Sequence, residues 1–128
     1  MYNIDYLPRT ERILTWAYEM FGPVATNLDE RAARLLEETI ELAQSCDVSK
    51  EVVLKIVDRV YGKPADHLPQ ELAGVCMTLD AFCGLLGVDP AMVSEIEYRR
   101  VSAFPKTYWE DRHALKVEDG IANLSEVK

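Results

Sequence analysis

Glycine and proline divide this chain into segments of helical length, and this punctuation limits the folds that the chain can adopt. Breaks fall at Gly22-Pro23, at Gly62 and at Gly87. Glycine often follows the last turn of a helix, and proline is tolerated in the first turn. Between the breaks, apolar residues recur at helical spacing. The pattern therefore predicts helices over residues 10–21, 27–46, 49–62, 69–87 and 89–104.

Several residues are suited to begin these helices. Ser49 and Asp89 are expected N-caps, and Asn27 with Glu30 three residues later has the pattern of a capping box. The stretch 51–61 is rich in β-branched residues, but its apolar positions follow helical spacing, so it is also predicted to be helical. We therefore expect an all-α fold, a bundle of four to five helices.

The domain prediction follows from where this periodicity stops. Residues 1–104 are expected to form one domain, which is usual for a chain of 128 residues. From Lys106 onward the apolar spacing is lost. Residues 105–128 are therefore predicted to be a C-terminal extension that is partly mobile.

The charge balance restricts the partners. The chain has 14 Lys and Arg against 22 Asp and Glu, a formal net charge of −8. A general nucleic-acid binder needs a basic face, so a nucleic-acid polymer is not an expected partner. An acidic protein can still bind phosphates through a divalent cation that its carboxylates hold.

The cysteines and the hydropathy bear on location. The three cysteines have no metal-binding spacing, which favours reduced thiols inside apolar helices. No apolar run approaches the roughly 18 residues of a membrane span, and the N-terminus has no apolar signal core. We therefore expect a cytoplasmic protein that does not interact with a membrane.

Four glutamates are the candidate functional residues. Glu37, Glu38 and Glu41 lie within an arc of about 100° on one helix, opposite its apolar face. Like charges this close destabilise a helix unless water or a cation screens them, so a solvated acidic face and a metal site are both open interpretations. Glu71 stands in the first turn of an apolar helix that we expect to be buried. The helix dipole alone would favour an acid there, and metal ligation would as well.

These glutamates carry a resemblance to a known family. Glu37-Glu38-x-x-Glu41, followed about thirty residues later by Glu71, resembles the MazG-like all-α nucleoside triphosphate pyrophosphatases over about residues 10–104. Their signature is Glu-Glu-x-x-Glu on one helix and Glu-x-x-Asp on a later one. The chain departs from it at Gly74, where the family has aspartate. A reduced metal site, an oxygen donor from another residue, and lost activity remain open at this position.

The resemblance implies a reaction and a set of roles. It implies Mg²⁺- or Mn²⁺-dependent hydrolysis of a (deoxy)nucleoside triphosphate to the monophosphate and pyrophosphate, by a homodimer or homotetramer. Glu38 would act as the general base besides being a ligand. The resemblance implies Glu37, Glu38, Glu41 and Glu71 for the metal. Phosphates also need cations and a base needs an aromatic or apolar slot, so the candidates are Arg34, Arg99 and Lys106 for the phosphates and Trp16 and Phe21 for the base.

Simpler interpretations accompany these assignments. Arg34 has the spacing to pair with Glu38, and Trp16 and Phe21 have the character of core residues. His113 carries no functional signal in the sequence. Two other functions stay open: a catalytically impaired protein that binds a nucleotide or a partner, and an acidic helical protein that occupies a basic site on a partner.

Overall fold

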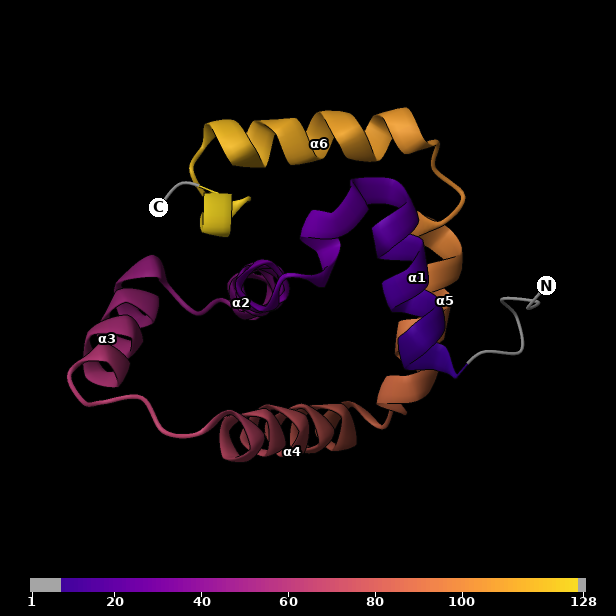
Figure 1. Cartoon of the computed structure of the whole chain (residues 1–128). Coiled ribbons are helices and arrows are strands. Elements are labelled where there is room, and N and C mark those ends of the chain that lie inside the picture. Colours follow the sequence, from indigo (N-terminus) through magenta and orange to yellow (C-terminus); the bar gives the residue numbers. More distant parts are fainter. Residues whose placement is uncertain (1–7, 127–128) are drawn as a thin grey trace. The chain divides into compact units, whose positions relative to one another are not determined.

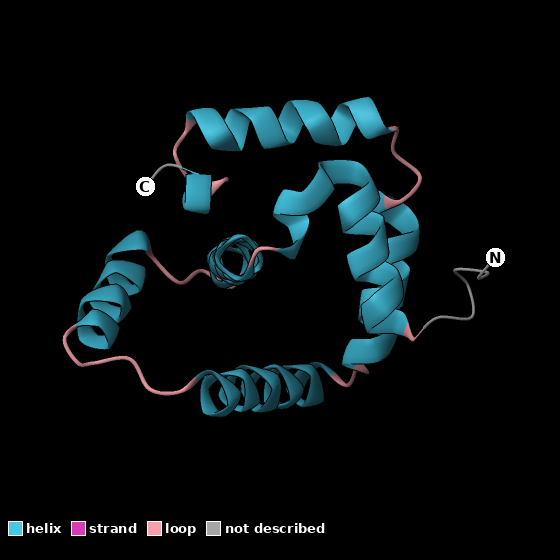
Figure 2. Ribbon diagram, in the orientation of Figure 1, coloured by secondary structure: helices cyan, strands magenta, loops and turns pink. Residues whose placement is uncertain are grey.

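The computed structural model of the chain describes residues 8–126. Over this range it contains α-helices, short 3-10 helices and no strand, so the predicted all-α class is confirmed (Figures 1 and 2). The elements in chain order are α1 (Arg9–Phe21), η2 (Gly22–Thr26), α2 (Leu28–Ser45), α3 (Lys50–Tyr61), α4 (Leu68–Leu86), α5 (Pro90–Val101), α6 (Lys106–Glu118) and η3 (Leu124–Glu126).

Local chemistry sets the helix ends where the sequence predicts them. The Ser49 hydroxyl accepts a hydrogen bond from the Val52 amide at 3.3 Å, which caps α3. The Asp89 carboxylate accepts from the Ala91 amide at 2.9 Å, at the start of α5. Gly87 ends α4 with a φ of 71°, a left-handed conformation that glycine adopts without strain.

The predicted capping box at the start of α2 does not form. The Asn27 amide donates to the Val24 carbonyl at 3.0 Å. The Glu30 carboxylate turns away from it and accepts from the Asn123 amide at 3.0 Å. A distant backbone donor has therefore replaced the local one, and the sequence pattern around Asn27 does not show this competition.

The C-terminal segment is more regular than predicted. Lys106–Glu118 form α6, although the apolar spacing is lost there. Trp109, His113 and Lys116 follow one another at helical spacing and share one face. This face consists of aromatic and polar residues instead of aliphatic ones, so hydrophobic periodicity could not reveal the helix.

The chain divides into two compact units, which are described separately. The first unit combines the chain up to Thr39 with the residues from Glu97 onward, and the second unit is Ile40–Ile96. In the first unit, α1 packs against η2 and α6. Its fully buried residues are Ala17, Ala25, Ala122 and, unusually, Glu30. The predicted domain boundary at residue 104 stays a prediction.

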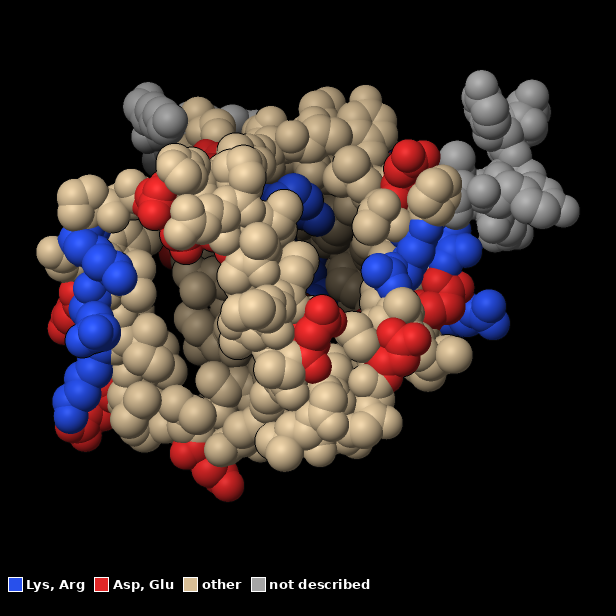
Figure 3. Space-filling view, turned by 90° about the horizontal axis from the view of Figure 1, so that it is seen from below, with Lys and Arg blue, Asp and Glu red and all other residues tan. Residues whose placement is uncertain are grey.

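The second unit buries few of its side chains. In α4, Cys83 is the buried residue, and α3 has none. Helix α4, which was predicted to be buried, leaves its side chains exposed except for Cys83 and the half-buried Phe82. Figure 3 shows few charged side chains over α4. The exposed large apolar side chains of α4, which are between 44% and 83% exposed, are Leu68, Leu72, Val75, Met77, Leu79, Leu85 and Leu86.

None of the described helices is by itself long and apolar enough to span a membrane. Only α4 and α5 taken together satisfy the length and composition, and the chain bends by 91° between them.

Candidate functional site

The first half of α2 packs through its charged side. Glu30, Arg34 and Glu37 share one side of the helix, within about 60° of one another. Glu30 is 1% exposed, whereas Leu35 and Leu36 on the apolar face are 49% and 56% exposed. The burial of α2 in its unit is thus the reverse of what its amphipathic pattern predicts.

Glu30 is held by several donors. Its Oε2 accepts from the Asn123 amide at 3.0 Å, and its Oε1 lies 3.4 Å from Arg34 Nη1 and 4.0 Å from His113 Nδ1. His113 Nε2 pairs with Asn123 Oδ1 at 2.9 Å. The hydrogen bonds from the Asn123 amide and Arg34 give the buried carboxylate the donors that its removal from water requires. We call Glu30, Arg34, His113 and Asn123 the Glu30 cluster.

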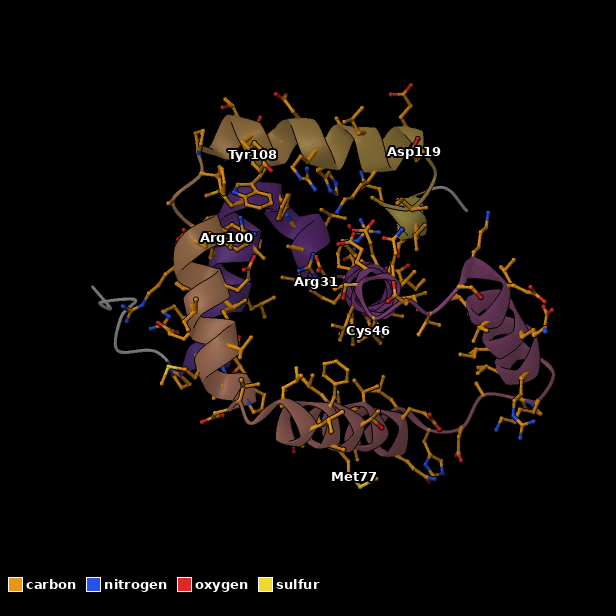
Figure 4. All side chains as sticks on the ribbon, turned by 180° about the vertical axis from the view of Figure 1, so that it is seen from behind. Arg31, Cys46, Met77, Arg100, Tyr108 and Asp119 are labelled. Carbon is orange, nitrogen blue, oxygen red and sulfur yellow. The ribbon has the colours of Figure 1, made fainter. Side chains whose placement is uncertain are left out.

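Further contacts extend from this cluster along α2. Arg34 Nη2 donates to the Ile121 carbonyl, and Ser125 Oγ donates to Asp29 Oδ2 at 2.5 Å. Figure 4 shows polar side chains between α6, marked by Tyr108 and Asp119, and the start of α2 near Arg31. Burial lowers the pKa of Arg31 from its ordinary value; Arg34 adds to the effect, and Glu30 opposes it. The C-terminal turn is therefore fastened to α2 by polar contacts.

Lys116 joins α6 to the predicted metal-binding motif. Its Nζ lies 2.6 Å from Glu37 Oε1, and the two side chains are 26% and 22% exposed. Glu37 is therefore neutralised by an ammonium from a helix that the sequence analysis did not predict. Glu38 and Glu41, further along the same acidic side, are exposed.

The predicted metal ligands come from two helices. Glu37 and Glu41 are one helical turn apart on α2, and Glu71 stands in the first turn of α4 and is exposed. Among residues 8–126, no three His, Cys, Asp or Glu side chains form a group that could hold a metal ion. Carboxylate oxygens nevertheless fit Mg²⁺, which commonly binds one or two carboxylates and completes its shell with water and substrate phosphates.

The predicted phosphate-binding residues have different surroundings. Arg34 is 17% exposed and pairs with Glu30, the acid one turn earlier on the same helix. Arg99, in the last turn of α5, and Lys106, which begins α6, are both exposed. Their use by a ligand stays a prediction.

The residue beside Arg99 is engaged within its own helix. Arg100 Nη2 donates to Glu97 Oε1 at 2.5 Å. This hydrogen bond lowers the pKa of Glu97, and it raises the pKa of Arg100.

Trp16 and Phe21, the predicted base-binding residues, lie in an aromatic cluster of the first unit. Their ring centroids are 6.2 Å apart, with the planes at 86°. Trp109 of α6 packs edge-to-face on Trp16 at 5.3 Å and on Phe21 at 6.2 Å. Trp109 Nε1 is buried without a hydrogen-bond partner among the described residues. The contacts are those of a packed aromatic core, and a role in binding a base stays a prediction.

Sequence reasoning missed the residues that fasten α6. They are His113, Lys116 and Asn123, and none of them carries a functional motif in the sequence. The spacing of His113 and Lys116 on one helical face was available as a signal, but it depended on recognising α6. The contact of Asn123 with Glu30 joins positions 93 residues apart, and no local pattern contains it.

Comparisons with known proteins add no family. The chain matches no protein-family model, and neither the curated proteins nor the solved structures contain a match to it. The functional assignment therefore depends on the motif and on the chemistry of its residues.

Proposed function

We propose that the protein is a Mg²⁺- or Mn²⁺-dependent nucleoside triphosphate pyrophosphohydrolase. It would convert a (deoxy)nucleoside triphosphate to the monophosphate and pyrophosphate. The observation that carries the proposal is the glutamate motif: Glu37, Glu38 and Glu41 follow one another on α2, and Glu71 stands in the first turn of α4. The all-α fold is compatible with the family that the motif resembles.

The residues would divide the chemistry as follows. Glu37, Glu41 and Glu71 are the proposed ligands, and Glu38 would also contribute an oxygen. When bound, the cation neutralises phosphate oxygens and lowers the pKa of a water molecule. Glu38 would take the proton from the attacking water, as a general base. Arg34, Arg99 and Lys106 would pair with phosphates, and Trp16 and Phe21 would contact the base.

A homo-oligomer is part of the proposal. The second unit leaves the aliphatic side chains of α4 exposed, and α3 does the same with Leu54, Ile56 and Val60 at 51–55%. Exposed apolar surface of this kind is typical of an interface between subunits. The partner that we propose is a second copy of the chain, in a dimer or tetramer. The three unbridged cysteines fit a reducing cytoplasm.

The test is pyrophosphate release. The wild-type protein is incubated with Mg²⁺ or Mn²⁺ and each common nucleoside triphosphate, and Glu41→Gln is compared with it. We expect Glu41→Gln to abolish the reaction and to leave helicity and melting temperature nearly unchanged, because Glu41 is exposed. Glu51→Gln, which removes an exposed acid paired with Lys55 at 3.1 Å, is the control. Full activity in Glu41→Gln would contradict the ligand assignment.

A second candidate function follows from Gly74. Without the aspartate that the resembled family has at this position, the protein would bind nucleotide without hydrolysing it. A Cβ at Gly74 would meet nothing within 4 Å, so the position has room for aspartate. We expect Gly74→Asp to bind Mg²⁺ more tightly by calorimetry. Gly84→Asp, in the same helix and with the same open surroundings, should not. Nucleotide binding by a wild-type protein that releases no pyrophosphate would favour this second candidate.

A further inference from the structure

One contact links the C-terminal helix to the proposed metal-binding motif. Lys116 Nζ of α6 lies 2.6 Å from Glu37 Oε1 of α2. We propose that Lys116 contacts the substrate and that, in the free protein, it is held in an ion pair with Glu37. In the free protein its ammonium neutralises Glu37. When a divalent cation binds the Glu37 carboxylate, the ion pair breaks and the Lys116 ammonium pairs with a phosphate of the substrate. This inference rests on the proposed function.

The backbone of Lys116 is held in place by the contacts that fasten α6. His113, one turn earlier, pairs with Asn123, and the Asn123 amide donates to buried Glu30. Ala122, beside Asn123, is 1% exposed. These contacts set the register of α6 against α2. The Lys116 side chain can still move its ammonium by several ångströms, because its stem has four flexible carbons.

Charge decides which cation Glu37 prefers. A divalent cation interacts with a carboxylate about twice as strongly as an ammonium does at the same distance. It can therefore displace Lys116, but the ammonium competes with it as long as no substrate is present. Once displaced, the ammonium lies beside a multiply charged phosphate chain, which lysine binds as a point charge. Lys116 thus weakens the binding of metal alone and strengthens the binding of metal with nucleotide.

These two effects have opposite signs, and a purely structural ion pair would not produce them. Lys116→Met keeps most of the apolar stem and removes the charge. We expect its dissociation constant for Mg²⁺ alone to fall about threefold to tenfold. The constant for an α,β-methylene nucleoside triphosphate at saturating Mg²⁺ should rise about tenfold. Lys116→Arg should restore much of the nucleotide affinity. Both titrations are made by calorimetry on the full chain.

Lys55→Met is the matched control, because Lys55 also pairs with a glutamate on a helix but is 73% exposed. It should change neither constant. Weaker or unchanged Mg²⁺ binding in Lys116→Met, or unchanged nucleotide binding, would overturn the inference. If the wild type releases pyrophosphate while Lys116→Met binds both ligands normally, the inference fails and the proposed function stands. A wild type that binds neither ligand and releases no pyrophosphate contradicts both.

A second variant covers the case in which Lys116→Met does not fold. Glu37→Gln leaves the ammonium without its carboxylate. We expect it to bind the same nucleotide analogue several-fold more tightly than wild type when EDTA removes all divalent cations. Equal or weaker binding would overturn the inference.

Discussion

The two units of the chain achieve burial in opposite ways. The first unit buries a carboxylate, Glu30, and surrounds it with donors from the C-terminal segment. The second unit buries Cys83 and leaves most of its aliphatic side chains exposed. The first unit is therefore completed by directional contacts within the chain. The second unit leaves apolar surface exposed, and we propose that a second copy of the chain covers it.

The largest effect should come from removing the buried charge. Glu30→Gln keeps the shape of the side chain but weakens its contacts with Arg34 and the Asn123 amide. We expect the free energy of unfolding to fall by about 3 kcal/mol, because breaking a buried ionic contact leaves its partner uncompensated. Urea unfolding followed by tryptophan fluorescence measures this, since Trp16 and Trp109 lie in the first unit. Glu51→Gln, at an exposed acid of the second unit, should cost less than about 0.5 kcal/mol. If the two variants lost equal free energy of unfolding, the proposed difference in burial between the units would be wrong.

The second largest effect should be on assembly. Leu72→Lys puts a charge on the exposed side of α4, where Leu72 is 55% exposed. Burying a leucine at an interface contributes about 1.5–3 kcal/mol, so the dissociation constant of the oligomer should rise about 10-fold to 100-fold. Analytical ultracentrifugation over a concentration series measures it. Leu115→Lys in the first unit, where Leu115 is 60% exposed, is the matched control and should leave the constant unchanged. The opposite ranking of the two variants would place the interface on the first unit.

Two variants at Asn123 separate two contributions to the stability of the first unit. Asn123 has a φ of 54°, a left-handed conformation that costs an ordinary residue about 1–2 kcal/mol. Asn123→Gly removes the hydrogen bond to His113 and keeps the conformation, so it should lower the free energy of unfolding by about 1 kcal/mol. Asn123→Ala removes the hydrogen bond and also disfavours the left-handed conformation, so it should lower the free energy of unfolding by about 1 kcal/mol more than Asn123→Gly. Chemical denaturation of the two variants under one condition separates the terms. Identical losses would mean that the conformation contributes nothing.

The smallest effect concerns a single cap in the second unit. Ser49→Ala removes the hydroxyl that accepts from Val52. It should lower the free energy of unfolding by about 0.5–1 kcal/mol. Amide hydrogen exchange should show the loss in the first turns of α3, while the amides of α6 keep their protection. Equal deprotection of α6 would mean that the two units unfold as one.

The two units also differ in how much of their structure could be predicted from the sequence. The start of α3 at Ser49 and the end of α4 at Gly87 follow from local chemistry, so they could be predicted. The inward face of α6 could not, because Trp109, His113 and Lys116 do not form an apolar stripe. The motif identified Glu37 as a candidate ligand but could not show its ammonium partner. That contact depends on a register set by residues far away in the chain.

The distance between Glu30 and Asn123 along the chain has a consequence for synthesis on the ribosome. They are 93 residues apart, and a ribosome adds about 5–20 residues each second. Glu30 is therefore made roughly 5–20 s before its backbone donor exists. All of α3 and α4 is translated within that interval. A nascent chain thus displays its apolar α3 and α4 surfaces while the Glu30 carboxylate is still hydrated. Two polysomal neighbours could associate through those surfaces before either one closes its first unit.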